Sequence, residues 1–291
     1  MANKSKGAFY IVIAAFFFAL MSLFVKLAGD LPTFQKSFFR NLVAVIFALS
    51  VLIHKKPEIK LNQGDVIGLI LRSAFGTIGI LCNFYAVDYL LLADATILNK
   101  LSPFFAVLAS AIILKEKIKP FQFLTIGCAL LGALFVIKPS SQIIASPSLI
   151  GLLGGISAAI AYTMVRWLGK RKITGPFVVF FFSSFSCLVL LPFTLQTYVS
   201  MSHIQLIYLI LAGTCAVIAQ FAITNAYFYA PAREISIFDY SQILFSALLG
   251  FVVFRQIPDY LSFIGYAIII ASAILNFVYN QKTIKKLKSF Q

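Results

Sequence analysis

Residues 173–232 read ITGPFVVFFFSSFSCLVLLPFTLQTYVSMSHIQLIYLILAGTCAVIAQFAITNAYFYAPA, and none of these 60 residues is Asp, Glu, Lys or Arg. The hydrocarbon core of a bilayer is about 30 Å thick, and a helix rises about 1.5 Å per residue. A single helix of this length would cover about three such thicknesses. The run must therefore turn back at least once, and the polar residues 194–203 are the expected turn.

The rest of the chain has the same character, because 61% of its 291 residues are hydrophobic and only 11% are charged. Soluble domains are about half apolar and about a quarter charged, so a water-soluble globule is excluded. The strands of a membrane barrel would be about 10 residues long and alternate in polarity, unlike these continuous runs. We therefore predict an all-α integral membrane protein with ten transmembrane helices. The expected spans are 7–28, 33–54, 65–88, 92–114, 119–138, 148–169, 176–197, 205–229, 232–254 and 259–281.

The positive charges are distributed unevenly over the ends of these spans. The chain has 24 Lys and Arg against 9 Asp and Glu, a net charge of +15. Sixteen of the 24 fall at one set of span ends, four at the other, and four within spans. The positive-inside rule then predicts a multi-pass protein of the cytoplasmic membrane with both termini in the cytoplasm. The excess charge records orientation in the lipid bilayer, so no nucleic-acid partner is expected.

The chain matches itself weakly when it is shifted by 140 residues. The shift places Ala86-x-x-Tyr89 on Ala226-x-x-Tyr229, and Asn99 on Asp239. Because each half holds five spans, an odd number, the second half must be inverted relative to the first. We predict halves at 1–140 and 141–291, joined by the Ser- and Pro-rich segment 139–147. Inverted repeats around a site at the bilayer midplane are typical of secondary transporters.

Several short motifs give the chain a resemblance to a known family. They are Phe38-Phe39-Arg40-Asn41, Leu101-Ser102-Pro103, Leu114-Lys115-Glu116-Lys117, Gly127 and Gly132. With them the chain resembles the EamA-type members of the ten-helix drug/metabolite transporter superfamily. The second half departs from the pattern, with Ile243 at the place of Pro103 and Phe254-Arg255-Gln256 at the place of a Gly-Glu turn. The resemblance implies a secondary carrier, often an exporter of amino acids or other small metabolites.

Lys100 and Asp239 are the first candidates for a substrate site. An ionisable group near the centre of a span costs about 2.5–3.5 kcal/mol, so it needs a partner or a function. Inverted symmetry would bring the helices of Lys100 and Asp239 to one central cavity from opposite sides. Such a cavity suits a zwitterion such as an amino acid. The alternatives are a structural ion pair, or a lysine that extends toward the membrane surface.

Polar residues within the spans are further candidates for that cavity. Asn99 and Gln242 belong to repeat-related helix faces with small and polar side chains, and Pro103 frees a backbone carbonyl beside Lys100. The other candidates are Tyr240, Arg40, Asn83, Asn225 and Tyr162. Each of them could instead bond to a neighbouring helix. The pattern Gly151-x-x-x-Gly155 predicts close contact between helices within the chain.

Two ion-pair gates complete the hypothesis. On the outer side, Arg40 is expected to pair with Asp88 or Asp94 when that side is closed. Near the cytoplasmic side, Arg72 is expected to form the counterpart gate with Arg233 and Glu234. Static pairs at helix ends are the alternative.

The sequence has no motif for redox, metal-binding or nucleotide-binding chemistry. There is no Cys-x-x-Cys, both histidines lie at span ends, and no Gly-rich phosphate loop is present. We expect no enzyme, no catalytic residues, no metal and no cofactor.

The leading hypothesis is a monomeric or homodimeric transporter that exports a small-molecule substrate by alternating access. Proton coupling of this transport through Asp239 or Glu234 is a further hypothesis. The alternatives are a flippase or carrier for a lipid-linked or nucleotide-type substrate and, less favoured, an intramembrane enzyme.

Overall fold

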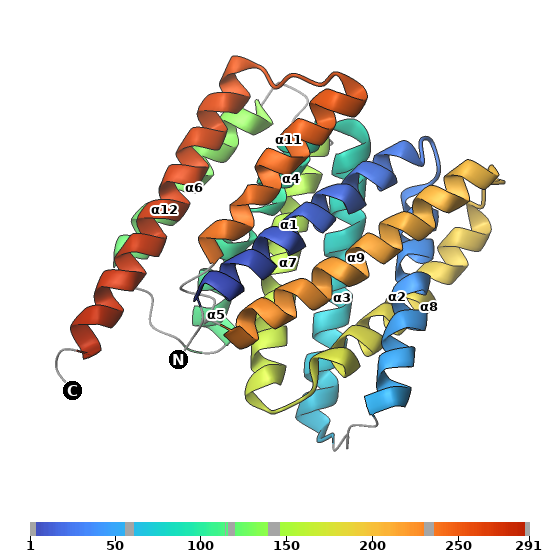
Figure 1. Ribbon diagram of the computed structural model, residues 1–291, viewed down its shortest axis with the longest axis horizontal. Helices are drawn as coiled ribbons and strands as arrows, with labels where there is room; N and C mark the ends of the chain where they lie inside the picture. Colours follow the sequence, from blue (N-terminus) through green and yellow to red (C-terminus); the bar gives the residue numbers. More distant parts are fainter. Residues whose placement is uncertain are drawn as a thin grey trace.

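All secondary structure in the described part of the chain is helical (Figure 1). The computed structural model describes residues 4–55, 61–113, 115, 120–138, 146–229 and 236–288. Its elements are α1 (Lys4–Leu27), α2 (Thr33–Lys55), α3 (Gln63–Tyr89), α4 (Leu92–Asn99), α5 (Ser102–Ile113), α6 (Pro120–Ile137), α7 (Pro147–Lys170), α8 (Gly175–Gln196), α9 (His203–Tyr229), η2 (Ser236–Tyr240), α11 (Ser241–Phe254) and α12 (Tyr260–Lys288).

These elements form ten helical segments in the described residues that are long and apolar enough to cross a membrane. α4 and α5 together form the fourth span, and η2 with α11 forms the ninth. The prediction of ten transmembrane helices is therefore confirmed. The expected start of the ninth span, at residue 232, lies outside the described residues.

Local signals in the sequence set several helix ends. At the start of α3, the backbone N–H of Asn62 donates to Oδ2 of Asp65 at 3.0 Å, one half of a capping box. At the start of α7, Oγ of Ser146 accepts from the backbone N–H of Leu149, and Pro147 follows at the first helical position. α1 is followed by Gly29 in the left-handed region, at φ +68°, where a residue without Cβ is favoured.

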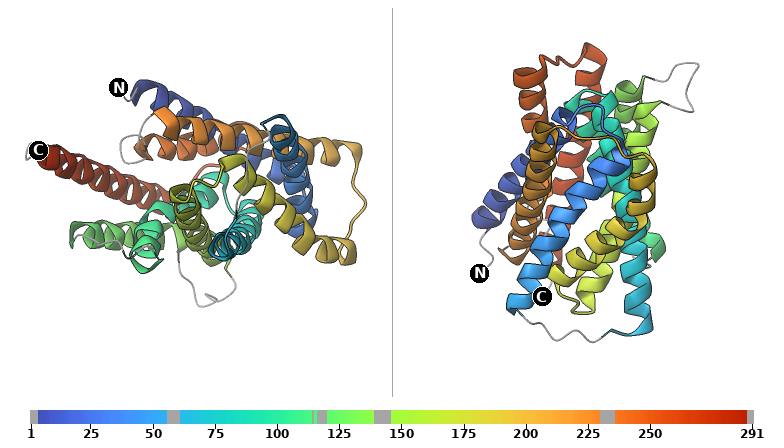
Figure 2. Two further views of the ribbon diagram at one scale, coloured as in Figure 1. Left: turned by 90° about the horizontal axis from the view of Figure 1, so that it is seen from below. Right: turned by 90° about the vertical axis from the view of Figure 1, so that its right-hand side faces the viewer.

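The two five-helix halves are interleaved. The first helix of each half packs against the third helix of the other, α1 on α9 and α7 on α3. Equivalent helices also pack in pairs, α2 on α8, α4 on α11 and α6 on α12. This exchange pattern is what a two-fold relation between inverted halves produces. In Figures 1 and 2, α6 and α12 lie together along one edge of the bundle, and α2 and α8 lie toward the other edge.

We call the side of the bundle where α1 begins and α12 ends the terminal face, and the opposite side the far face (Figure 1). At the far face, Lys138 after α6 pairs with Asp259 before α12 and donates to Oγ of Ser262. The hydrogen bond from Lys138, with the backbone N–H of Ser262, lowers the pKa of Asp259 below its usual value. These bonds tie the ends of the two edge helices together.

Glycines allow the closest helix contacts. A Cβ at Gly155 on α7 would lie 2.7 Å from the carbonyl oxygen of Leu98 on α4. A Cβ at Gly151 would lie 3.1 Å from the Cβ of Ala86 on α3. The predicted contact of these two glycines within the chain is confirmed. At the edge of the bundle, a Cβ at Gly265 on α12 would lie 2.6 Å from the carbonyl oxygen of Gly132 on α6.

The fourth span differs from the continuous helix expected over 92–114. α4 ends at Asn99 and α5 begins at Ser102, with Lys100 and Leu101 in the turn between them. Pro103 has no N–H to donate to the carbonyl of Asn99, and the N–H groups of Phe104 and Phe105 both donate to Leu101. The second half changes from η2 to α11 at Tyr240, which the repeat places on Lys100. The helix geometry therefore changes at equivalent positions, by a break between α4 and α5 in the first half and by the passage from η2 to α11 in the second.

Candidate functional site

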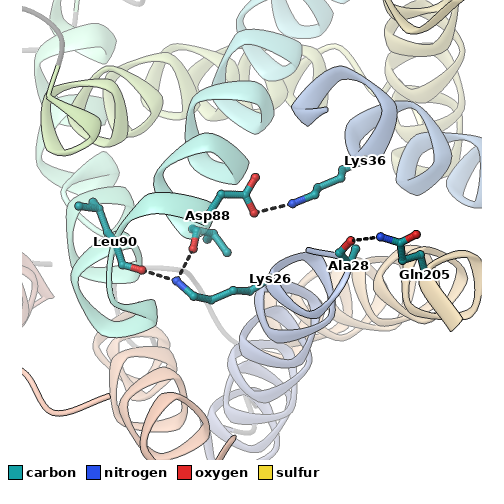
Figure 3. Close-up of polar contacts among 7 residues, drawn as sticks. Lys26, Ala28, Lys36, Asp88, Leu90 and Gln205 are labelled. Carbon is teal, nitrogen blue, oxygen red and sulfur yellow. Dashed lines mark hydrogen bonds and ion pairs between the residues drawn. The ribbon is translucent and has the colours of Figure 1, made fainter. Parts of the chain in front are cut away.

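A polar cluster joins α1, α2 and α3 at the far face (Figure 3). The ammonium of Lys36 on α2 is fully buried and lies 2.6 Å from Oδ1 of Asp88 on α3. The ammonium of Lys26 on α1 donates to the backbone carbonyls of Val87, at 2.7 Å, and Leu90. Two lysines from different helices thus converge on the last turn of α3. In this conformation they hold the far-face ends of the three helices together.

Glutamine side chains extend this closure to other helices. Gln35 on α2 exchanges two hydrogen bonds with the backbone of Val199, at 2.9 and 3.1 Å. Gln205 on α9 donates to the carbonyl of Ala28 at 3.0 Å (Figure 3). Gln256, which follows α11, accepts from the backbone N–H of Leu92 on α4 at 3.1 Å. The far face is therefore closed by bonds between both halves of the chain.

Lys100 and Asp239 meet at the break in the fourth span and the change of helix type in the ninth. Nζ of Lys100 lies 2.6 Å from Oδ2 of Asp239, and their side chains are 9% and 19% exposed. The hydroxyl of Tyr240 donates to the backbone carbonyl of Lys100 at 3.2 Å. A side chain at the end of η2 thus satisfies a carbonyl in the turn between α4 and α5. The structure brings together the two charges that the sequence assigned to one cavity, and it pairs them directly.

The predicted outer gate has different partners in this conformation. Asp88 pairs with Lys36, and Asp94 accepts from the hydroxyl of Tyr266 on α12 at 2.6 Å. Nη1 of Arg40 donates to Oδ1 of its neighbour Asn41 at 2.7 Å. Among the described residues no ion pair joins Arg40 to either carboxylate. The reason is position, since Lys36 lies one turn nearer to the far face on α2 than Arg40.

Arg40 and Arg72 instead line one cavity between α2, α3, α8 and α9. Both side chains are buried, and the guanidinium of Arg72 stacks on the ring of Phe182 with its carbon 4.0 Å from the centroid. Arg233 and Glu234, the expected partners of Arg72, lie outside the described residues. The inner gate therefore stays a prediction.

The other predicted cavity residues lie in different surroundings. Gln242 and Tyr240 are buried, and Asn83 and Asn99 are partly buried. Tyr162 on α7 is 49% exposed. The side chain of Asn225 lies outside the described part of the chain.

Three residues with polar contacts described above, Lys26, Lys36 and Tyr266, are not among the site residues predicted from the sequence. The sequence places Lys26 and Lys36 near span ends and gives no signal for Tyr266. The available signal is the position of Lys36 inside an expected span, four residues before Arg40. Its partner Asp88 is 52 residues away, so the pairing itself could not be recognised without the fold.

Comparisons with known proteins agree with this architecture. The profile of the EamA-like transporter family matches residues 5–138 and 146–278. The pseudopaline exporter CntI of Pseudomonas aeruginosa is 31% identical over 271 residues, which cover 92% of this chain and 94% of the exporter. A riboflavin transporter of Brucella anthropi is 25% identical over 277 residues, covering 90% and 95% of the two chains. A solved crystal structure with 15% sequence identity has the same fold, with a TM-score of 0.64 over 96% of this chain and 99% of that chain.

The family profile matches both halves of the chain, and the relatives are named as transporters of small molecules. The structure agrees with this match, since its described residues form ten helical segments long and apolar enough to span a membrane. The chain is a member of the EamA-like transporter family, a membrane transporter of small molecules and not an enzyme.

Proposed function

We propose that the chain is a secondary transporter that exports a small charged metabolite by alternating access between its two inverted halves. The observation that carries the proposal is the Lys100–Asp239 pair, which lies at the break between α4 and α5 and beside the passage from η2 to α11. Interrupted helices at membrane depth are tolerated where they line a cavity. Charged groups placed there are typical of substrate pathways. The closed far face supplies one of the two states that alternating access needs.

The orientation is part of the proposal. In the sequence, sixteen of the 24 Lys and Arg fall at the set of expected span ends that includes both termini, which favours the cytoplasm for the terminal face. The far face would then open outward. The similarity to an exporter of Pseudomonas aeruginosa supports outward movement of the substrate.

Vesicle efflux tests this function. Proteoliposomes are loaded with the twenty amino acids, short dicarboxylates and diamines, and the solutes that remain inside are measured by mass spectrometry over time. We expect selective loss of a few charged solutes, at least about tenfold faster than from vesicles with the double variant Lys100→Met/Asp239→Leu. The double variant removes both charges together, so it leaves neither one uncompensated. Equal retention by both proteins would contradict the proposal.

Proton coupling through Asp239 is a second element of the proposal. Oδ2 of Asp239 bonds to Lys100, whereas Oδ1 is buried and has no hydrogen-bond partner among the described residues. A carboxylate oxygen in this position is available to accept a proton when the Lys100 pair opens. We expect efflux to slow when a protonophore removes an imposed pH gradient. The variant Asp239→Asn is expected to lose this sensitivity, and efflux that ignores the gradient in the unmodified protein would refute the coupling.

A further inference from the structure

The cavity that contains Arg40 and Arg72 has an unusual lining for the interior of a membrane protein. It has a volume of about 30 Å³ and lies between α2, α3, α8 and α9. A single water needs about 10–15 Å³ measured in this way, so there is room for about two waters or one carboxylate group. Apart from the two arginines, Ser183 and Gln220, the residues that line it are apolar.

Three buried polar atoms around this cavity have no hydrogen-bond partner in the described part of the chain. They are Nε of Arg40, Nε of Arg72 and Oγ of Ser183. Both arginines are only 8% exposed, and Ser183 is fully buried. Buried polar groups are normally bonded, and an unmatched donor costs free energy. Two charged donors and one hydroxyl around the same cavity therefore indicate a missing ligand that accepts hydrogen bonds.

The described carboxylates of the spans do not supply the countercharge. Each has another partner: Asp65 pairs with Arg171, Asp88 with Lys36 and Asp239 with Lys100, while Asp94 bonds to Tyr266. Arginine stays protonated in proteins, so both guanidinium groups carry their charge. Two positive charges with no acid beside them among the described residues are strongly unfavourable inside a membrane unless an anion binds there.

The guanidinium of Arg72 is held in a fixed position. A Cβ at Gly76, one turn later on α3, would lie 2.1 Å from Nη1 of Arg72 and 2.8 Å from the ring of Phe182. The guanidinium thus occupies the space that the missing side chain of Gly76 leaves, and stacks on Phe182 from the other side. A planar group held in this way offers parallel N–H donors, the arrangement that binds a carboxylate through two bonds.

Aromatic rings cover one side of the cavity. The rings of Phe47 on α2 and Phe221 on α9 both line it and pack edge to face, with centroids 5.5 Å apart. Phe47 is 48% exposed, so this pair lies between the cavity and the outer surface of the bundle.

We propose that Arg40 and Arg72 bind a carboxylate of the transported metabolite, which makes the substrate a small organic acid or an amphoteric molecule with a free carboxylate. The inference rests on the proposed transport function, because it assigns the anion bound by the two arginines to the transported substrate. An anionic lipid phosphate shares the same chemistry, and the experiment separates it from a substrate carboxylate.

Ligand-induced thermal stabilisation tests the site directly. The protein is placed in nanodiscs of phosphatidylcholine alone and titrated with glutarate, L-glutamate and citrate, with the uncharged diamide glutaramide as the matched control. We expect at least one of the three acids to raise Tm by several degrees at saturation, since a ligand that binds only the folded state stabilises it. Glutaramide is expected to have no effect. If none of the acids acts, the proposal is overturned.

Charge variants identify the residues. Arg40→Gln and Arg72→Gln are each expected to weaken acid binding at least about tenfold. Arg40→Lys, which keeps the charge without the planar fork, is expected to fall between them and the unmodified protein. Arg166→Gln, which changes an exposed arginine of α7, is the control for net charge and is expected to leave binding unchanged.

Without ligand, Arg40→Gln is expected to raise Tm, because it removes an uncompensated buried charge. Acid binding that is unaltered in both glutamine variants would overturn the proposal.

Two further arms distinguish the outcomes. If phosphatidylglycerol in the nanodiscs raises Tm through the same arginines and abolishes the effect of the acids, the site binds a lipid phosphate and the substrate assignment is wrong. If the acids bind through the arginines but no solute leaves proteoliposomes, the anion site stands and the proposed transport fails. If vesicles export solutes without a carboxylate equally well in Arg40→Gln and Arg72→Gln, transport stands and the anion site fails.

Discussion

Asp88→Leu is expected to lower the free energy of unfolding by about 3–5 kcal/mol. The substitution leaves the ammonium of Lys36 without its partner at 2.6 Å, in a position where the lysine side chain is fully buried. An isolated buried charge has lost its hydration and gains nothing in return. The neighbouring ammonium of Lys26, bonded to the carbonyls of Val87 and Leu90, adds repulsion instead of compensation. Chemical denaturation of the purified protein in detergent measures the loss.

The double variant Lys36→Met/Asp88→Leu provides the matched control. Replacing a whole buried ion pair by apolar side chains is often neutral or even stabilising. We therefore expect the double variant to recover most of the stability that Asp88→Leu loses, with a coupling energy of at least about 1 kcal/mol in the double-mutant cycle. Additive effects of the two single substitutions would show that the pair contributes nothing to closure of the far face.

Gly155→Ala is expected to destabilise the fold by about 1–3 kcal/mol, and Gly155→Val by more. The new Cβ would lie 2.7 Å from the carbonyl oxygen of Leu98, and this neighbour is backbone. Leu98 is fully buried and lies just before the interruption of the fourth span, so α4 cannot move aside without disturbing the Lys100 turn. The same denaturation assay measures the change.

Gly127→Ala is the control for this prediction. Gly127 lies within α6, and nothing lies within 4 Å of the Cβ that alanine would add. Alanine is a better helix former than glycine by about 0.5–1 kcal/mol, so this variant is expected to be neutral or more stable. If Gly155→Ala were stabilised to the same extent as Gly127→Ala, the close approach of α7 to α4 would be refuted.

The transmembrane helices were predictable because the bilayer fixes the length of an apolar span. All ten expected spans coincide with helical segments within a few residues, in the parts that the structure describes. The interruption of the fourth span was only partly predictable. Pro103 marks it in the first half, but the equivalent change at Tyr240 has no proline and depends on how α11 packs against α4.

The candidate site was predictable in its residues more than in its contacts. Lys100 and Asp239 were assigned to one cavity from the repeat, and they lie 2.6 Å apart. Arg40 and Arg72 were assigned to opposite gates, whereas they line the same cavity. The depth of a residue in the membrane can be estimated from its position along a helix. The residue that it contacts on a neighbouring helix cannot be estimated in this way.

The sequence by itself determined the membrane environment, the ten helices and the inverted halves, because hydrophobic length and an odd span count depend only on the order of residues. The tertiary structure decided which charges are compensated. Lys36 stands near a span end in the sequence, yet its side chain is fully buried against Asp88, and two arginines lie together without a described acid. The physical reason is that a buried charge is stabilised by atoms within about 4 Å, and residues far apart in the chain supply those atoms only after the helices have packed.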